Sequence, residues 1–286
     1  MNQLINLFLI SVILICLCSC TFNNIDDDEK NQVMDTENQV VDEIIENKGT
    51  NNEVTSEIIE TVYFDNEMIY EIIEAEYSDN NEMMDLYIKI AYPQIAGLEN
   101  EYIEYVINNE IKETALKVLE IYDSLEGTTI NSEYSITYAS NDILSIYFHA
   151  YITYVPENSF MYYLRSNISA NYLISTGEKI GFSDVININE DFINSFYDNF
   201  HIQLKYESDE ETKRIIDGDV KSTFALDNLL LSDQDNYTEV CSYFTEDSLV
   251  ISIAVRKAPG SYALYEAKYA DIEEFLNSRF KMILEE

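Results

Sequence analysis

The sequence predicts an α+β protein in which antiparallel sheets are packed by a long helix and are followed by a smaller α+β unit. Runs rich in Ile and Tyr lie close together and are separated by short polar turns, which is typical of hairpins. A stretch near residue 110 instead repeats its apolar residues at helical spacing. Because hairpins pair antiparallel, we expect sheets that are not mainly parallel and that contain no β–α–β crossover.

The first folded unit is assigned to residues 61–175. Strands are expected over residues 68–77 and 83–92, with a polar turn at residues 78–81 between them. Residues 92–97, which include Pro93 and Gly97, are expected to break this pattern. A long helix is predicted over residues 100–122. Its expected buried face consists of Ile103, Ile107, Ile111, Ala115, Val118 and Tyr122.

Three more strands are predicted over residues 131–139, 142–154 and 160–174, with turns at residues 140–141 and 156–159. The middle strand alternates between two sides. The apolar side is expected in the core and consists of Leu144, Ile146, Phe148, Ala150 and Ile152. The other side is amphipathic and consists of Ser145, Tyr147, His149, Tyr151 and Thr153. We expect the long helix to cover the apolar side only, so that the tyrosine side forms a surface.

The second unit is assigned to residues 176–286 and begins with a turn at Thr176 and Gly177. A short apolar segment at residues 182–186 precedes helices predicted over residues 190–204 and 208–218. The first of these helices is expected to bury Phe192, Phe196 and Phe200, and the second opens with a capping box of Ser208 and Glu211. A hairpin is expected over residues 240–245 and 248–255. A closing helix over residues 271–284 has an apolar face of Ile272, Phe275, Leu276 and Ile283.

The amino terminus has the pattern of a bacterial lipoprotein signal. An apolar run over residues 4–17 ends in Leu17, Cys18, Ser19 and Cys20, which resembles a lipobox, although no Lys or Arg precedes the run. The run is about 14 residues long, shorter than the roughly 20 that a transmembrane helix needs. We therefore expect a signal peptide over residues 1–19 and acylation, such as palmitate, on Cys20. Residues 20–60 would then be the lipidated Cys and a disordered acidic linker, and the protein would be extracytoplasmic and anchored to the cell membrane by its lipid.

The chain is strongly acidic. It has 54 acidic and 16 basic residues and a formal charge of −38, of which residues 61–286 carry about −28. This charge excludes nucleic acid as a partner, because phosphate binding needs a basic surface, and it permits a cationic partner. Only Cys241 stays free once the signal is removed and Cys20 is acylated. With His149 and His201 as the two histidines, we expect no metal, cofactor or internal disulfide.

No catalytic motif is present in the sequence, so the chain is interpreted as a binding module and not as an enzyme. The alternative is an enzyme that modifies or hydrolyses cell-wall polysaccharide with a pair of carboxylates. Glycosidases need only two such groups, and an acidic chain brings some of them close together by abundance alone.

Two segments of the chain resemble known families. Tyr92, Pro93, Gln94, Ile95 and Gly97, followed by Asn108 and Ile111, resemble the domain that precedes the catalytic part of PdaC polysaccharide deacetylases. The second segment is similar to the domain of the anti-sigma factor RsiV. Its matching residues are Thr176, Gly177, Glu178, Lys179, Phe182, Asp184, Val185, Phe244, Leu249, Ala258, Pro259, Gly260, Tyr262, Tyr269 and Ile272. The resemblance implies an extracytoplasmic α+β module without the catalytic and sigma-binding parts, and in RsiV-like proteins this region binds lysozyme.

The expected ligand is a cationic protein such as lysozyme, or a cell-wall ligand. Tyrosine is favoured at the energetic centres of interfaces, and a negative surface steers a basic partner toward it. The candidate contact residues are Tyr147, His149, Tyr151, Tyr162 and Tyr163.

Overall fold

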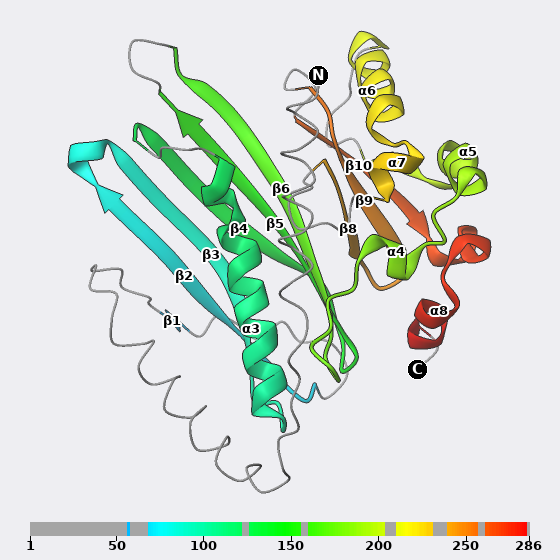
Figure 1. Ribbon diagram of the computed structural model, residues 1–286, viewed down its shortest axis with the longest axis horizontal. Helices are drawn as coiled ribbons and strands as arrows, with labels where there is room; N and C mark the ends of the chain where they lie inside the picture. Colours follow the sequence, from blue (N-terminus) through cyan, green and yellow to red (C-terminus); the bar gives the residue numbers. More distant parts are fainter. Residues whose placement is uncertain are drawn as a thin grey trace, which may run out of the picture. The chain divides into compact units, whose positions relative to one another are not determined.

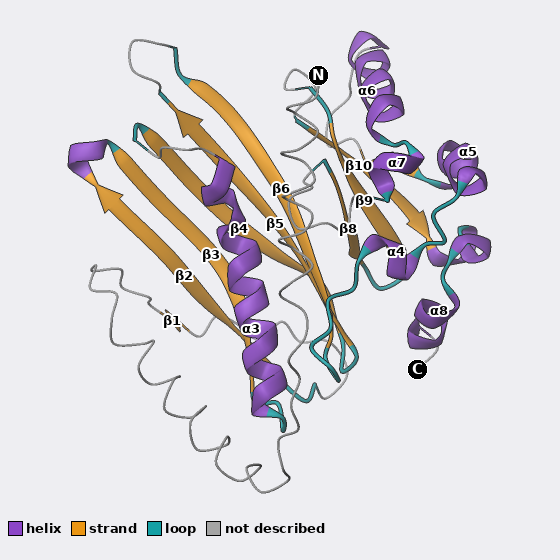
Figure 2. Ribbon diagram, viewed as in Figure 1, coloured by secondary structure: helices purple, strands orange, loops and turns teal. Residues whose placement is uncertain are grey.

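The computed structural model describes residues 56–57, 68–121, 126–155, 160–203, 210–230, 239–256 and 261–284. Residues 52–286 form one compact unit. Within the described ranges this unit contains a six-stranded and a four-stranded sheet together with several helices (Figures 1 and 2), which confirms the α+β class. The predicted signal peptide and the acylated Cys20 lie outside the described residues, and the division of the folded region at residue 175 stays a prediction.

The six strands of the large sheet follow one another in chain order. They are β1 Ser56–Glu57, β2 Glu71–Asn81, β3 Leu86–Ala96, β4 Thr128–Ala139, β5 Ile143–Tyr154 and β6 Tyr162–Leu173. Every neighbouring pair is antiparallel except β3 and β4, which are parallel. The expectation of no crossover was therefore wrong, because the helix between β3 and β4 returns the chain to the same end of the sheet. β1 also places two residues of the predicted linker in the sheet.

The β2–β3 hairpin is longer than predicted. β2 continues through the expected turn to Asn81, and the chain reverses in a 3-10 turn over Glu82–Met84, with Asp85 in the left-handed region at φ 49°. β3 also continues through Pro93, which pairs with β2, so the expected break at residues 92–97 was wrong. Beyond the short parallel ladder with β4, Asn108 takes the place of a strand partner for Ile95. The amide of Asn108 accepts from the Ile95 N–H at 2.8 Å and donates to the Ile95 carbonyl at 2.9 Å.

The long helix α3 spans Glu101–Leu116 and continues into a 3-10 turn over Lys117–Ile121. Asn100 caps it by accepting from the backbone N–H groups of Tyr102 and Ile103. The prediction that Ile107 and Ile111 are buried is confirmed, and Ala115 and Val118 are buried as well. We call the side of the large sheet that α3 covers the inner face and the opposite side the outer face (Figure 1). Tyr122 lies outside the described residues.

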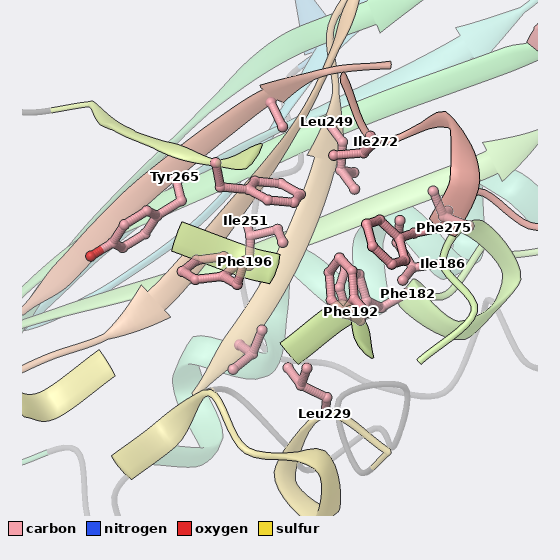
Figure 3. Close-up of a cluster of buried hydrophobic side chains, with 14 of the residues drawn as sticks. Phe182, Ile186, Phe192, Phe196, Leu229, Leu249, Ile251, Tyr265, Ile272 and Phe275 are labelled. Atoms are coloured by element: carbon pink, nitrogen blue, oxygen red, sulfur yellow. The ribbon is translucent and has the colours of Figure 1, made fainter. Parts of the chain in front are cut away.

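The second sheet is antiparallel throughout and has the order β7, β10, β9, β8. Its strands are β7 His201–Gln203, β8 Val240–Phe244, β9 Ser248–Ala254 and β10 Tyr262–Lys268. The helices of this part are α4 Phe182–Val185, α5 Glu190–Asn199, α6 Glu210–Thr223, α7 Leu226–Leu229 and α8 Ser278–Leu284, with 3-10 turns at Tyr269–Asp271 and Glu273–Phe275. Phe192, Phe196 and Phe200 are buried as predicted, and they pack in an aromatic cluster with Tyr265 of β10 and Phe275 (Figure 3).

Several boundaries in this part differ from the prediction. The helix expected over residues 190–204 ends at Asn199, because Phe200 turns to extended backbone to enter the core and residues 201–203 pair with β10. α6 continues through Gly218, which costs about 1 kcal/mol relative to Ala but does not end a helix. Ser208 lies outside the described residues. β10 was not predicted, and the expected closing helix is divided into two 3-10 turns and α8.

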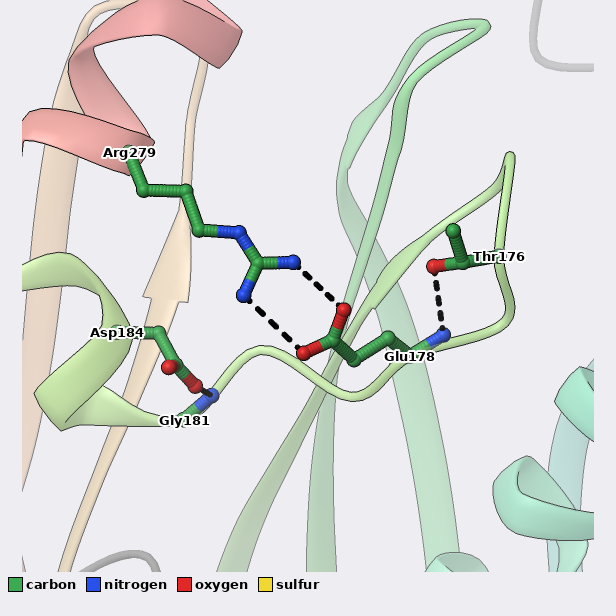
Figure 4. A network of polar contacts seen from close by, with 5 residues as sticks. All are labelled: Thr176, Glu178, Gly181, Asp184 and Arg279. Atoms are coloured by element: carbon green, nitrogen blue, oxygen red, sulfur yellow. Dashed lines mark hydrogen bonds and ion pairs between the residues drawn. The ribbon is translucent and has the colours of Figure 1, made fainter.

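An ion pair fastens α8 to the segment that leaves the large sheet (Figure 4). After β6 the chain turns at Gly177, whose φ is +73° and whose N–H donates to the Leu173 carbonyl at 2.8 Å. The next residue, Glu178, accepts two hydrogen bonds from the guanidinium of Arg279, at 3.2 and 2.6 Å. Further along, Asp184 accepts from the Gly181 N–H at 2.9 Å and opens α4. A bidentate pair of this kind fixes orientation as well as contact.

Candidate functional site

The tyrosine side of β5 lies on the outer face, and the second sheet covers half of it. Ser145, at one end of the strand, is fully buried. Its hydroxyl accepts from the Phe244 N–H of β8 at 2.9 Å and donates to Asn171 Oδ1 of β6 at 2.7 Å. Asn171 in turn donates to the Ser242 carbonyl of β8 at 2.9 Å. We call this set of hydrogen bonds the polar seam. It provides the partners that the edge strand β8 lacks within its own sheet.

Tyr147 belongs to the covered half, so the expectation that it lies on an open surface was wrong. Its ring packs on Tyr243 of β8 with ring centroids 4.7 Å apart. Burial raises the pKa of the Tyr147 hydroxyl, which also hydrogen-bonds Ser252 of β9. Tyr147 is therefore half-buried and forms a structural contact between the sheets.

The other half of the outer face is open, and three rows of side chains cross it from strand to strand. The register places Tyr87, Thr129, Thr153 and Tyr163 in the first row. The second row consists of Lys89, Asn131, Tyr151 and Arg165. The third consists of Glu133, His149 and Asn167, and it borders the second sheet, where Asn167 contacts Ser252. We call these three rows the open outer face.

Of the predicted contact residues, His149, Tyr151 and Tyr163 lie on the open outer face. His149 contacts Tyr151 edge-on with ring centroids 6.0 Å apart, and it lies 3.3 Å from the carboxylate of Glu133. The guanidinium of Arg165 lies over the Tyr151 ring at 5.3 Å. Tyr162 is different, because it is next to Tyr163 on a strand and pairs with Tyr154, so its side chain is directed to the inner face.

The open outer face carries charged groups of both signs. Lys89 forms an ion pair with Glu76 at 3.2 Å, and Glu74 also contributes to the raised pKa of Lys89. Glu133 lies beside His149 at 3.3 Å. Carboxylates therefore accompany the basic side chains on this face.

An acidic and aromatic surface lies instead on the exposed side of α3, which the sequence analysis did not single out. Glu101, Tyr102, Tyr105, Asn109 and Glu113 are all exposed there, and we call them the α3 face. Tyr102 is 73% exposed and Tyr105 is 57% exposed. The helical spacing that identified the buried side of the helix also defines this opposite stripe, so the signal was present in the sequence.

Several titratable groups among the described residues have structural partners. The hydrogen bonds from Arg256 and Arg279 hold the pKa values of Asp219 and Glu178 below their ordinary range. Burial raises the pKa of the Cys241 thiol to about 11, which makes its thiolate rare at neutral pH. Among the described residues, no three His, Cys, Asp or Glu side chains are grouped so as to hold a metal ion.

None of the helices in the described ranges is long and apolar enough to cross a membrane. The apolar run at residues 4–17 lies outside those ranges, so the lipid anchor stays a prediction.

Comparison with known proteins gives similar solved structures but no family model. No family model matches the chain, and no curated protein gives a significant match. A member of the DUF3298 family from Bacteroides fragilis NCTC 9343 is 10% identical with a TM-score of 0.45, covering 73% of this chain and 93% of that chain. A DUF3298 family protein from Pseudomonas aeruginosa PAO1 is 7% identical with a TM-score of 0.42, covering 75% of this chain and 96% of that chain. Both of these structures are of DUF3298 family proteins, and the resemblance to PdaC and RsiV stays a prediction.

Proposed function

We propose that this protein is an extracytoplasmic lipoprotein whose folded region binds a cationic protein, such as lysozyme, without catalysing a reaction. The observation that supports the proposal is the α3 face, where two exposed tyrosines lie among exposed carboxylates. For this reason the proposal assigns the contact to α3 rather than to the tyrosines of β5 and β6.

Charge favours the α3 face as a docking surface for a basic partner. Between residues 99 and 120 the chain carries six Glu and two Lys, so the helix and its flanks are clearly acidic. Opposite charges accelerate encounter between partners, and added salt weakens that attraction. Exposed carboxylates alone contribute little affinity, so the energy of the complex must come from buried contact area.

Tyr102 and Tyr105 provide that contact area. They are three residues apart, which places them on neighbouring positions of one helix surface. Tyrosine buries a large ring at a low cost in side-chain entropy and keeps a hydroxyl that can hydrogen-bond at the edge of an interface. We therefore expect the two rings to be the anchors of the complex and the carboxylates around them to orient it.

Calorimetry with lysozyme tests the docking surface. A soluble form that starts at residue 21 is titrated at low and at high salt, and the heat should diminish as salt rises. Replacing Glu101 and Glu113 together by Lys should weaken binding by about tenfold or more, which corresponds to about 1.4 kcal/mol. The control replaces Glu273 and Glu274 by Lys, which changes the net charge equally at two exposed positions far along the chain. No heat at either salt concentration, or equal losses in the two variants, would contradict the proposal.

The lipid anchor is tested separately in cells. Cys20→Ser removes the predicted acyl acceptor, so the protein should move from the membrane fraction to the soluble fraction. Ser19→Thr, next to it, keeps a small side chain before the Cys and serves as the control. A Cys20→Ser protein that stays in the membrane fraction would rule out the lipoprotein interpretation.

A further inference from the structure

We propose that one end of the large sheet inserts into the surface of the lipid bilayer that carries the predicted lipid anchor, and that this surface has no net charge. The inference rests on the anchor in the proposed function but uses a part of the fold other than the α3 face. The inserting residues are Met83 and Met84 in the turn between β2 and β3, Val155 after β5, and Phe160 and Met161 before β6. We call these five residues the apolar tip.

The apolar tip is exposed to an unusual degree. Met83 is 94% exposed and Phe160 is 87% exposed, which makes them the two most exposed large apolar side chains in the described part of the chain. Met84, Val155 and Met161 are exposed as well. A single exposed apolar residue is normal on a protein surface, but several gathered at one place mark an interaction surface.

Backbone hydrogen bonds join the loops that carry the apolar tip. The Gly127 N–H, just before β4, donates to the Met84 carbonyl at 2.8 Å, and the Val155 N–H donates to the Gly127 carbonyl at 3.0 Å. Val155 and Met161 are the next positions beyond the last pair of the β5–β6 ladder. Figure 1 shows the β2–β3 turn, the start of β4 and the neighbouring ends of β5 and β6 at the same end of the sheet. The apolar side chains are therefore presented together.

The composition of the apolar tip fits a lipid surface. Three of its five residues are Met, which has a flexible apolar side chain that adapts to irregular surroundings, and Phe160 provides a large apolar ring. Such side chains can enter fluid hydrocarbon without a complementary pocket, and the gain grows with the apolar area that leaves water.

The charge around the apolar tip disfavours a second copy of this chain and selects the kind of lipid surface. Glu82 and Asp85 flank the two methionines, Glu126 precedes Gly127, and all three acidic residues are exposed. A two-fold dimer through the tip would bring two sets of these carboxylates together, and like charges repel. Anionic headgroups would repel them for the same reason, so the tip should prefer headgroups without net charge.

The predicted tether is long enough for this contact. Ser56 of β1 pairs with Ala75 of β2, and β2 runs from there to Asn81 at the tip, a distance of about 20 Å at strand spacing. Residues 21–55 connect Cys20 to Ser56, and the flexible linker that the sequence predicts would span about 33 Å on average. A lipid on Cys20 therefore permits the tip to reach the same membrane.

Fluorescence quenching in vesicles tests the proposal on the full chain. The sequence contains no tryptophan, so one introduced tryptophan reports its own surroundings. The Phe160→Trp chain is reconstituted into phosphatidylcholine vesicles with and without bromine on the acyl chains, which quenches an indole ring that enters the hydrocarbon. Brominated lipid should remove most of the emission. The control is Tyr197→Trp, at an exposed position on α5, whose emission should stay unchanged. Replacing part of the lipid by phosphatidylglycerol should weaken the quenching of Phe160→Trp, and salt should partly restore it.

A charge introduced at the tip gives the second test. Met83→Asp, added to the Phe160→Trp chain, should abolish most of the quenching, whereas Met282→Asp makes the same change at an exposed position on α8 and should not. Both chains should still float with the vesicles, because the lipid anchor still holds them, so a failure of the tip and a failure of the anchor give different results. Absence of quenching in Phe160→Trp, equal quenching in Tyr197→Trp, equal effects of the two Asp variants, or stronger quenching with phosphatidylglycerol would each overturn the proposal.

Discussion

Removing one hydroxyl from the polar seam should destabilise the whole folded region. Ser145→Ala deletes the group that pairs the Phe244 N–H at 2.9 Å and Asn171 Oδ1 at 2.7 Å. Ser145 is fully buried, and Phe244 and Asn171 are 1% and 4% exposed, so water does not replace the lost partner. Thr137 also loses its bond to the Ser145 hydroxyl, but it keeps an alternative acceptor, the Ser145 carbonyl at 3.2 Å.

The magnitude follows from the two groups that are left without a partner. Each unsatisfied buried polar group costs about 1–3 kcal/mol, so two of them should lower the free energy of unfolding of Ser145→Ala by about 2–6 kcal/mol. That is a large part of the about 5–15 kcal/mol by which a domain is stable. If the Ser145 hydroxyl only filled space, its removal would lower the free energy of unfolding by much less.

Urea denaturation of the soluble form, followed by circular dichroism, measures the change. Ser222→Ala is the control, because Ser222 is exposed on α6 and its loss should change stability by less than about 0.5 kcal/mol. If Ser145→Ala also stays within that margin, the seam does not hold the sheets together, and the covering of Tyr147 by the second sheet loses its physical explanation.

Two further predictions concern a turn and an ion pair. Gly127→Ala should lower the free energy of unfolding by more than about 2 kcal/mol, because the residue has φ +69° and an added Cβ would lie 2.7 Å from the carbonyl oxygen of Val155. Gly97→Ala is the control: this residue has φ +91° and nothing within 4 Å of an added Cβ, so the substitution should cost only the backbone strain of about 1–2 kcal/mol. Equal losses of stability for the two variants in thermal unfolding would contradict this account. Asp219→Asn should cost at most about 1 kcal/mol at pH 7, since Arg256 is largely exposed. The hydrogen bonds from Arg256 lower the pKa of Asp219 in the folded state. The stabilisation that the Asp219 carboxylate contributes is therefore present above about pH 4 and is lost as the pH falls through the pKa of Asp219 in the folded protein. The difference in stability between Asp219→Asn and wild type should accordingly become smaller in acid. A difference that stays constant from neutral to acid pH would show that the carboxylate charge is not involved.

The elements with a long and regular pattern could be predicted from the sequence. Four members of the predicted stripe of α3 are buried, whereas Ile103 is half-buried and Tyr122 lies outside the described residues. The apolar side of β5 is buried as predicted. Each of these patterns is set by one element packing on one core. The same holds for Phe192, Phe196 and Phe200, although the helix ends at Asn199, before the third of them.

What the sequence did not show depends on partners far away in the chain. The amino-acid pattern on the polar side of β5 is the same whether water or another sheet covers that side. The second sheet covers it through contacts such as that of Ser145 with Phe244, which is 99 residues away in the chain. The direction of β4 relative to β3 likewise depends on how the helix between them packs. The alternation of apolar and polar residues within either strand does not indicate this direction. The tyrosine alternation of β5 therefore directed the prediction to the outer face. The α3 face was implied by the helical spacing of the same sequence but was not singled out.

Tyrosine footprinting tests the central claim, that the folded region binds a basic protein through the α3 face, most directly. Hydroxyl-radical modification of the soluble form is measured with and without lysozyme, and each modified tyrosine is located by mass spectrometry. The account predicts protection of Tyr102 and Tyr105 in the complex, with Tyr163 on the opposite face of the sheet and Tyr197 on α5 unchanged. The account would be contradicted if Tyr102 and Tyr105 were not protected, or if Tyr163 and Tyr197 were protected as strongly as they are.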